Sequence, residues 1–156
     1  MKFMILAIGK KNDPKLALAI EDYTKRFSHY ADISWRLVEA KISRSMKPDQ
    51  IKRVESDLLL TNIEPSDRVI LLDEAGMQLS SIELSNKMQN YMNQGDKGIV
   101  FIIGGAYGVN EEVISRSDFI WSLSKLVFPH QLVRLILIEQ LYRAHTILAG
   151  EKYHHM

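Results

Sequence analysis

Short apolar runs alternate with segments of helical periodicity along the chain. Continuous apolar runs are typical of strands buried on both faces, and they predict strands over 2–9, 68–73 and 98–105. An alternating pattern predicts a strand over 33–40, and residues 118–128 read as a fifth strand followed by a loop. Apolar residues at helical spacing, each group preceded by a proline or a capping residue, predict helices over 14–27, 48–62, 81–93, 129–148 and, briefly, after Asn110.

The order of these elements predicts the fold class. Strands and helices alternate, which is typical of an α/β fold with a mostly parallel sheet and helices on both of its faces. The length of 156 residues favours one domain over 1–156. The segments 41–47 and 74–80 are expected to be loops, the first of them basic and the second around Gly76.

Three segments that follow predicted strands carry unusual residues. They read LLDEAG (71–76), IIGGAYG (102–108) and LSKLVFPH (123–130). Ligands of open parallel sheets bind beyond the carboxyl ends of the strands. We therefore expect the three segments to form one site.

The glycines of the middle segment limit the kind of ligand. Gly104, Gly105 and Gly108 form G-G-x-x-G, which is neither the dinucleotide fingerprint nor a P-loop. A phosphate site is therefore poorly supported. The glycines either make a tight strand-to-helix turn or let backbone amides come close to a ligand, such as the edge of an adenine.

The helix predicted over 129–148 is apolar nearly all round, so it needs cover on several sides. A partner subunit could supply that cover, and so could the rest of the domain. His130, Arg134 and His145 fall on one stripe of this helix. Arg134 must be paired, for instance with Glu139 or another acid, or must meet a ligand.

Composition adds exclusions and one charge asymmetry. The chain has no cysteine, which excludes disulfides and thiolate metal sites, and the adjacent His154 and His155 do not predict a metal site. The apolar run 3–8 is too short for a signal peptide or a membrane span, so a cytoplasmic protein is expected. The net charge is +1, yet residues 1–53 hold 12 basic and 6 acidic side chains. This basic half is either a footprint for a polyanion or a set of solvated helix faces.

The motifs resemble a known family across essentially the whole chain. LLDEAG, FIIGGAYG, LSKLVFPHQLVR, IEQLYRAHTI and the closing KYHH are similar to the RlmH (YbeA-type) methyltransferases of the SPOUT class. The resemblance implies an α/β-knot fold, a homodimer and S-adenosyl-L-methionine as the methyl donor. It also implies methylation at N3 of a pseudouridine in 23S ribosomal RNA of assembled ribosomes.

The same resemblance implies site residues. The knot loops of the family hold the cofactor mainly through backbone, which points here to Leu72, Gly104, Gly105, Leu123, Ser124, Lys125, Leu126, Val127 and Phe128. Arg134 or Arg143 is expected to stabilise charge, and Tyr153 or His154 to contact the target base. A SPOUT methyltransferase of transfer RNA and a non-catalytic ribosome-binding protein are the alternatives.

Overall fold

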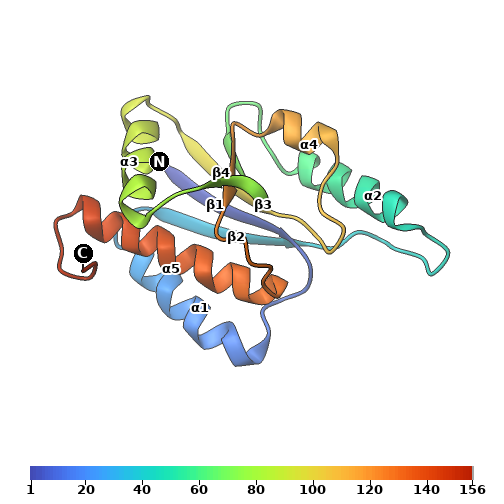
Figure 1. The fold of residues 1–156 in the computed structure, drawn as a ribbon, viewed down its shortest axis with the longest axis horizontal. Coiled ribbons are helices and arrows are strands. Elements are labelled where there is room, and N and C mark those ends of the chain that lie inside the picture. The colour runs from blue at the N-terminus through green and yellow to red at the C-terminus, as the bar shows by residue number, and fades with distance from the viewer. Residues whose placement is uncertain (156) are drawn as a thin grey trace.

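The computed structural model of the protein describes residues 1–155 and contains one five-stranded sheet (Figure 1). Every neighbouring pair of strands is parallel, and their order is β2-β1-β4-β3-β5. The strands are β1 (Lys2–Ile8), β2 (Asp32–Val38), β3 (Arg68–Gln78), β4 (Gly98–Ile103) and β5 (Phe119–Ser122). The helices are α1 (Pro14–Phe27), α2 (Pro48–Thr61), α3 (Ser81–Asn93), α4 (Glu111–Arg116) and α5 (His130–Leu148). The predicted α/β fold with a parallel sheet is confirmed.

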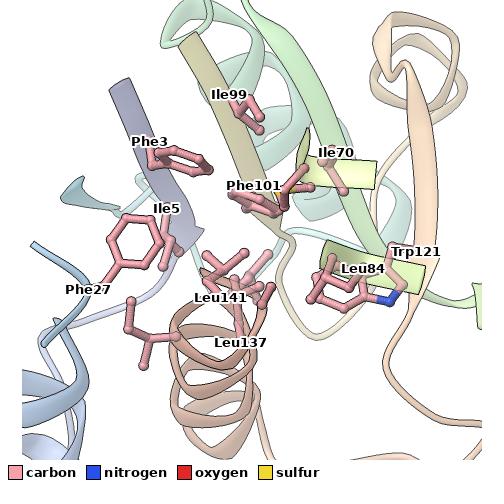
Figure 2. Close-up of a cluster of buried hydrophobic side chains, with 14 of the residues drawn as sticks. Phe3, Ile5, Phe27, Ile70, Leu84, Ile99, Phe101, Trp121, Leu137 and Leu141 are labelled. Atoms are coloured by element: carbon pink, nitrogen blue, oxygen red, sulfur yellow. The ribbon is translucent and has the colours of Figure 1, made fainter. Parts of the chain in front are cut away.

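Helices cover both faces of the sheet, and the alternation of side chains along each strand explains why. α1, α3 and α5 lie on one face, and α2 and α4 lie on the other (Figure 1). Phe3 and Ile5 of β1 point into the first core, where they pack with Phe27, Phe101 and Leu141 (Figure 2). Leu6 and Ile8 of β1, which have the opposite orientation, point into the second core with Leu59 of α2 and Val113 of α4.

Local hydrogen bonds fix the starts of the helices that the sequence predicts. The Ser80 side chain accepts from the backbone N–H of Glu83, and the Glu83 carboxylate accepts from the N–H of Ser80. The Asn110 side chain likewise accepts from the N–H of Val113 at the start of α4. These caps satisfy donors that the first helical turn leaves unpaired.

The loop expected over 74–80 is wrong in part. β3 continues to Gln78, and its register against β5 shifts between Leu72 and Met77. Gly76 passes so close to β5 that a Cβ there would lie 2.5 Å from the carbonyl oxygen of Ile120. The sequence favours a loop here because Gly76 and the polar residues around it are unfavourable in strands, and most of the extension is exposed, including 62% of Met77.

Two further expectations concern the whole chain. Within residues 1–155, no helix combines the length and the apolar character that a membrane span requires. The trefoil knot implied by the family resemblance stays a prediction.

Candidate functional site

A cavity of about 600 Å³ lies at the carboxyl ends of β3, β4 and β5. The three segments that the sequence singles out converge on it, the first of them within β3, and His130 and Val133 of α5 complete the wall. Most residues predicted to hold a cofactor line this cavity, namely Leu72, Gly104, Gly105, Leu123, Ser124, Leu126, Val127 and Phe128. Lys125 is exposed and is not among the lining residues. The arrangement is that expected for the ligand site of an open parallel sheet.

The glycine turn after β4 is required by its own packing. The Gly108 N–H donates to the carbonyl of Gly105 at 3.1 Å, and Gly108 has a φ of +75°. A Cβ on Gly104 would lie 3.0 Å from Val109 Cγ1. A Cβ on Gly105 would overlap the carboxylate of Glu55 on α2. The glycines therefore make the tight turn that the first interpretation expects, and this turn lines the cavity; the approach of backbone amides to a ligand stays a prediction.

His130 connects the start of α5 to this turn. Its Nε2 lies 2.7 Å from the carbonyl oxygen of Gly104. Because a carbonyl only accepts hydrogen bonds, Nε2 carries the hydrogen and Nδ1 is left as an acceptor. Burial lowers the pKa of His130, and the positive charge of Arg134 lowers it further. The imidazole is therefore kept neutral and holds the turn in place.

Arg134 lies behind the site and forms no ion pair with any residue of 1–155. It is fully buried, and its Nη1 donates to the carbonyl of Lys10 at 2.8 Å and to Asn12 Oδ1 at 3.1 Å. Nε and Nη2 have no hydrogen-bond partner among the described residues. An ion pair with Glu139, one of the two alternatives left open by the sequence, is therefore wrong. Burial without a carboxylate partner lowers the pKa of Arg134.

Arg143, Tyr153 and His154 form a second cluster, which we call the tail cluster together with Glu139. The Glu139 carboxylate accepts from Arg143 Nη2 at 2.7 Å and from the Tyr153 hydroxyl at 3.1 Å. The Arg143 guanidinium lies over the Tyr153 ring at 4.7 Å, and its Nη1 lies 3.3 Å from His154 Nδ1. Segment 150–155 thus folds back against α5. Burial raises the pKa of Tyr153, so its hydroxyl stays a hydrogen-bond donor.

The predicted catalytic residues are therefore divided between two places. His130 begins α5, whereas Arg143 lies 13 positions further along the same helix, or about 20 Å at 1.5 Å per residue. Arg134 lies beside His130, close to the cavity. Within one chain, the tail cluster does not meet the cavity.

Sequence reasoning missed several acidic residues at the cavity and in the tail cluster. Asp73 and Glu74 line the cavity, and the carboxylate of Glu55 touches the glycine turn. The pairing of Glu139 with Arg143 follows helical i,i+4 spacing and could have been recognised. No sequence signal marks Glu55, because the contact depends on how α2 packs against a loop 50 residues away. Residues 1–155 contain no group of three or more metal-ligating side chains.

Comparison with known proteins assigns the chain to a family. The family model described as a predicted SPOUT methyltransferase matches residues 1–154. Ribosomal RNA large subunit methyltransferase H of Flavobacterium psychrophilum is 43% identical over 156 residues, with 99% of each chain covered. The proteins of the same name from Christiangramia forsetii and Bacteroides thetaiotaomicron are 43% and 39% identical, again over 99% of each chain. This protein therefore belongs to the SPOUT methyltransferase family.

Proposed function

We propose that the protein transfers a methyl group from S-adenosyl-L-methionine to N3 of a pseudouridine in 23S ribosomal RNA, on ribosomes in the cytoplasm. The observation that carries the proposal is the cavity formed by the three segments in a chain of the SPOUT methyltransferase family. The relatives are named ribosomal RNA large subunit methyltransferase H, which favours this substrate over transfer RNA.

The cavity suits the proposed cofactor. Its volume of about 600 Å³ lies within the range of about 300–1,000 Å³ that is typical of small-molecule sites. Backbone around Gly104 and the segment 123–128 would hold the adenosyl part, because the glycines leave their amides without side-chain cover. Leu72, Leu123 and Phe128 supply apolar wall. When bound, S-adenosyl-L-methionine supplies an electrophilic methyl group on a sulfonium.

The tail cluster suits recognition of the target base. The N3 proton of a pseudouridine must leave, and donors near its oxygens would stabilise the resulting charge. Arg143 can only donate, so His154 Nδ1 acts as the acceptor of their contact and Nε2 is left as a donor. Arg143 and His154 Nε2–H would thus contribute donors, and the Tyr153 ring a stacking surface, while the Tyr153 hydroxyl donates to Glu139 and so orients the ring.

A homodimer would unite the two places that one chain keeps apart. Leu126 and Val127, beside the cavity, are 69% and 80% exposed, and Leu132, Val133, Leu135 and Ile136 of α5 are only partly buried. Apolar surface of this kind at a cavity mouth favours cover by a second copy. A copy packed through α5 would bring its tail cluster to the cavity of the first chain.

Ile136→Glu is expected to convert the dimer into monomers. Ile136 is partly exposed on α5, so a carboxylate there would be buried and unpaired only in the dimer. Light scattering at low micromolar concentration should give twice the chain mass of 18.0 kDa for the natural protein and the single mass for the variant. Leu137→Glu does not test the interface, because Leu137 is fully buried in its own domain. A natural protein that scatters as a monomer would overturn the proposed dimer.

An exposed basic stretch supports ribosomal RNA as the partner. Lys41, Arg44, Lys47 and Arg53 are exposed, and Lys52 is partly exposed, along the loop after β2 and along α2. Phosphate contacts from such residues give strongly salt-dependent binding.

The proposed reaction is tested by methylation of purified ribosomes and transfer RNA side by side. Protein and S-adenosyl-L-methionine are added to both RNAs from cells that lack the modification, and the nucleosides are then analysed by mass spectrometry. The expected product is N3-methylated pseudouridine in 23S RNA alone. Calorimetry with S-adenosyl-L-methionine separates the alternatives, because a non-catalytic adaptor needs no such site. Methylation confined to transfer RNA, or a lack of cofactor binding, would overturn the proposal.

A further inference from the structure

Glu55 is a buried carboxylate that the proposed reaction does not use. Its side chain belongs to α2, is only 7% exposed, and its Oε1 has no hydrogen-bond partner among the described residues. Burial raises its pKa, and no cation within residues 1–155 forms an ion pair with it that would offset that cost. A buried carboxylate without a cationic partner is costly, and either a bound proton or a positively charged ligand nearby reduces that cost.

The carboxylate lies against the wall of the cavity. It touches Gly105, whose backbone lines the cavity, so only the thickness of one glycine residue separates the charge from the ligand space. The next residue of α2 fixes this position, because the hydroxyl of Ser56 accepts from the N–H of Asn110 at 3.0 Å. Glu55 is therefore held behind the glycine turn rather than free to move to solvent.

The side chains that line the cavity add further negative charge to that of Glu55. Asp73 and Glu74 lie at its β3 side, and no lysine or arginine belongs to the lining within the described residues. His130 is kept neutral by burial. Two cations lie nearby: Lys125 is exposed between the lining residues Ser124 and Leu126, and Arg134 lies behind His130 with its Nη1 directed to the loop after β1. The cavity thus combines an uncharged wall on α5 with three carboxylates on or behind its other walls.

We propose that Glu55, together with Asp73 and Glu74, makes the cavity select its ligands by charge. The carboxylates strengthen binding of the sulfonium donor, S-adenosyl-L-methionine, but not binding of its uncharged thioether product, S-adenosylhomocysteine. This inference rests on the proposed use of S-adenosyl-L-methionine. The donor and S-adenosylhomocysteine differ by one methyl group and one positive charge. A carboxylate in a partly desolvated setting interacts with that charge and is indifferent to its loss in the product. Glu55 acts here by its charge across Gly105 and does not itself touch the ligand.

The test compares the two ligands on charge-neutral variants by calorimetry at about pH 8, above the usual pKa range of carboxyl groups. Glu55→Gln keeps the shape and removes the charge. It is expected to raise the Kd for S-adenosyl-L-methionine roughly five- to tenfold and the Kd for S-adenosylhomocysteine less than about twofold. Glu74→Gln should raise the ratio of the two Kd values, that for S-adenosyl-L-methionine over that for S-adenosylhomocysteine, by about twofold. Asp57→Asn, which removes an exposed carboxylate from the same helix, is the matched control and should leave the ratio unchanged.

The outcomes separate a charge effect from a structural one. If Glu55 only supports the glycine turn, Glu55→Gln raises the Kd values of both ligands by the same factor, and the inference is overturned. An unchanged ratio in Glu74→Gln overturns it as well, and this variant decides the matter if Glu55→Gln does not fold. A natural protein that binds neither ligand would instead contradict the proposed function, which keeps the two failures distinguishable.

Discussion

Deleting residues 152–156 is expected to lower single-turnover methyl transfer to ribosomal RNA by at least about a hundredfold. The deletion removes the Tyr153 hydroxyl, its stacking surface and the His154 imidazole, while the cavity stays intact. Loss of target positioning typically costs factors of this size or more. Cofactor affinity, measured by calorimetry, should change only modestly. The single-turnover rate constant is measured with saturating S-adenosyl-L-methionine and purified ribosomes.

The tail also has structural contacts, so the variant needs a control for stability. Tyr30 donates to the Glu151 carboxylate at 2.6 Å, and this contact is retained when residues 152–156 are removed. Thermal unfolding and light scattering should therefore show a folded dimer. The matched point variant Tyr153→Phe keeps the ring and removes the hydroxyl that contacts Glu139. Near-normal rates for the deletion would show that the tail is dispensable.

Mixing two inactive variants tests whether the site is shared between subunits. The tail deletion has an intact cavity, and a cavity variant such as Gly104→Val has an intact tail. Random exchange makes half of the dimers mixed, and each mixed dimer holds one complete site, so activity should return to about a quarter of the natural level. If each chain contained its own complete site, mixing would restore nothing.

Gly104→Val is expected to weaken S-adenosyl-L-methionine binding by about a hundredfold or more and to abolish methyl transfer with it. Even a Cβ at this position lies 3.0 Å from Val109 Cγ1, and a branched side chain must also enter the cavity that Gly104 lines. The Gly104 carbonyl, which accepts from His130, would be displaced as well. Calorimetry measures the affinity, and thermal unfolding verifies that the variant is folded. Unchanged affinity in a folded variant would contradict the assignment of this turn to the cofactor.

A smaller pair of variants separates the turn's packing from its approach to the ligand. Gly104→Ala adds only the Cβ that meets Val109, and Val109→Ala removes the atom it meets. If packing causes the loss of affinity, the double variant should regain it. If the ligand itself needs the space, the double variant should stay weak. Val109→Ala alone is the control.

The repeating patterns of the sequence were enough to predict the elements of this fold. Apolar runs such as FMILAI (3–8) and FII (101–103) are buried on both faces in the structure, as a parallel sheet covered by helices requires. The prolines and caps at Pro14, Pro48 and Asn110 mark helix starts within a residue of where they lie. The segments LLDEAG, IIGGAYG and LSKLVFPH could also be expected to meet, because parallel strands end at one edge.

The sequence by itself thus determined the succession of strands and helices along the chain, the parallel sheet and the three segments that form the cavity. Only the tertiary structure decided the contacts of three further residues. Tyr153 donates to Glu139, Arg134 donates to the backbone carbonyl of Lys10 instead of to an acid, and Glu55 lies behind Gly105. The physical reason is the range of each signal. Periodicity and capping act over a few neighbouring residues, so they can be read from the chain. The contacts of Glu55 and Arg134 join residues 50 or more positions apart. They depend on how whole elements pack, which no local pattern records.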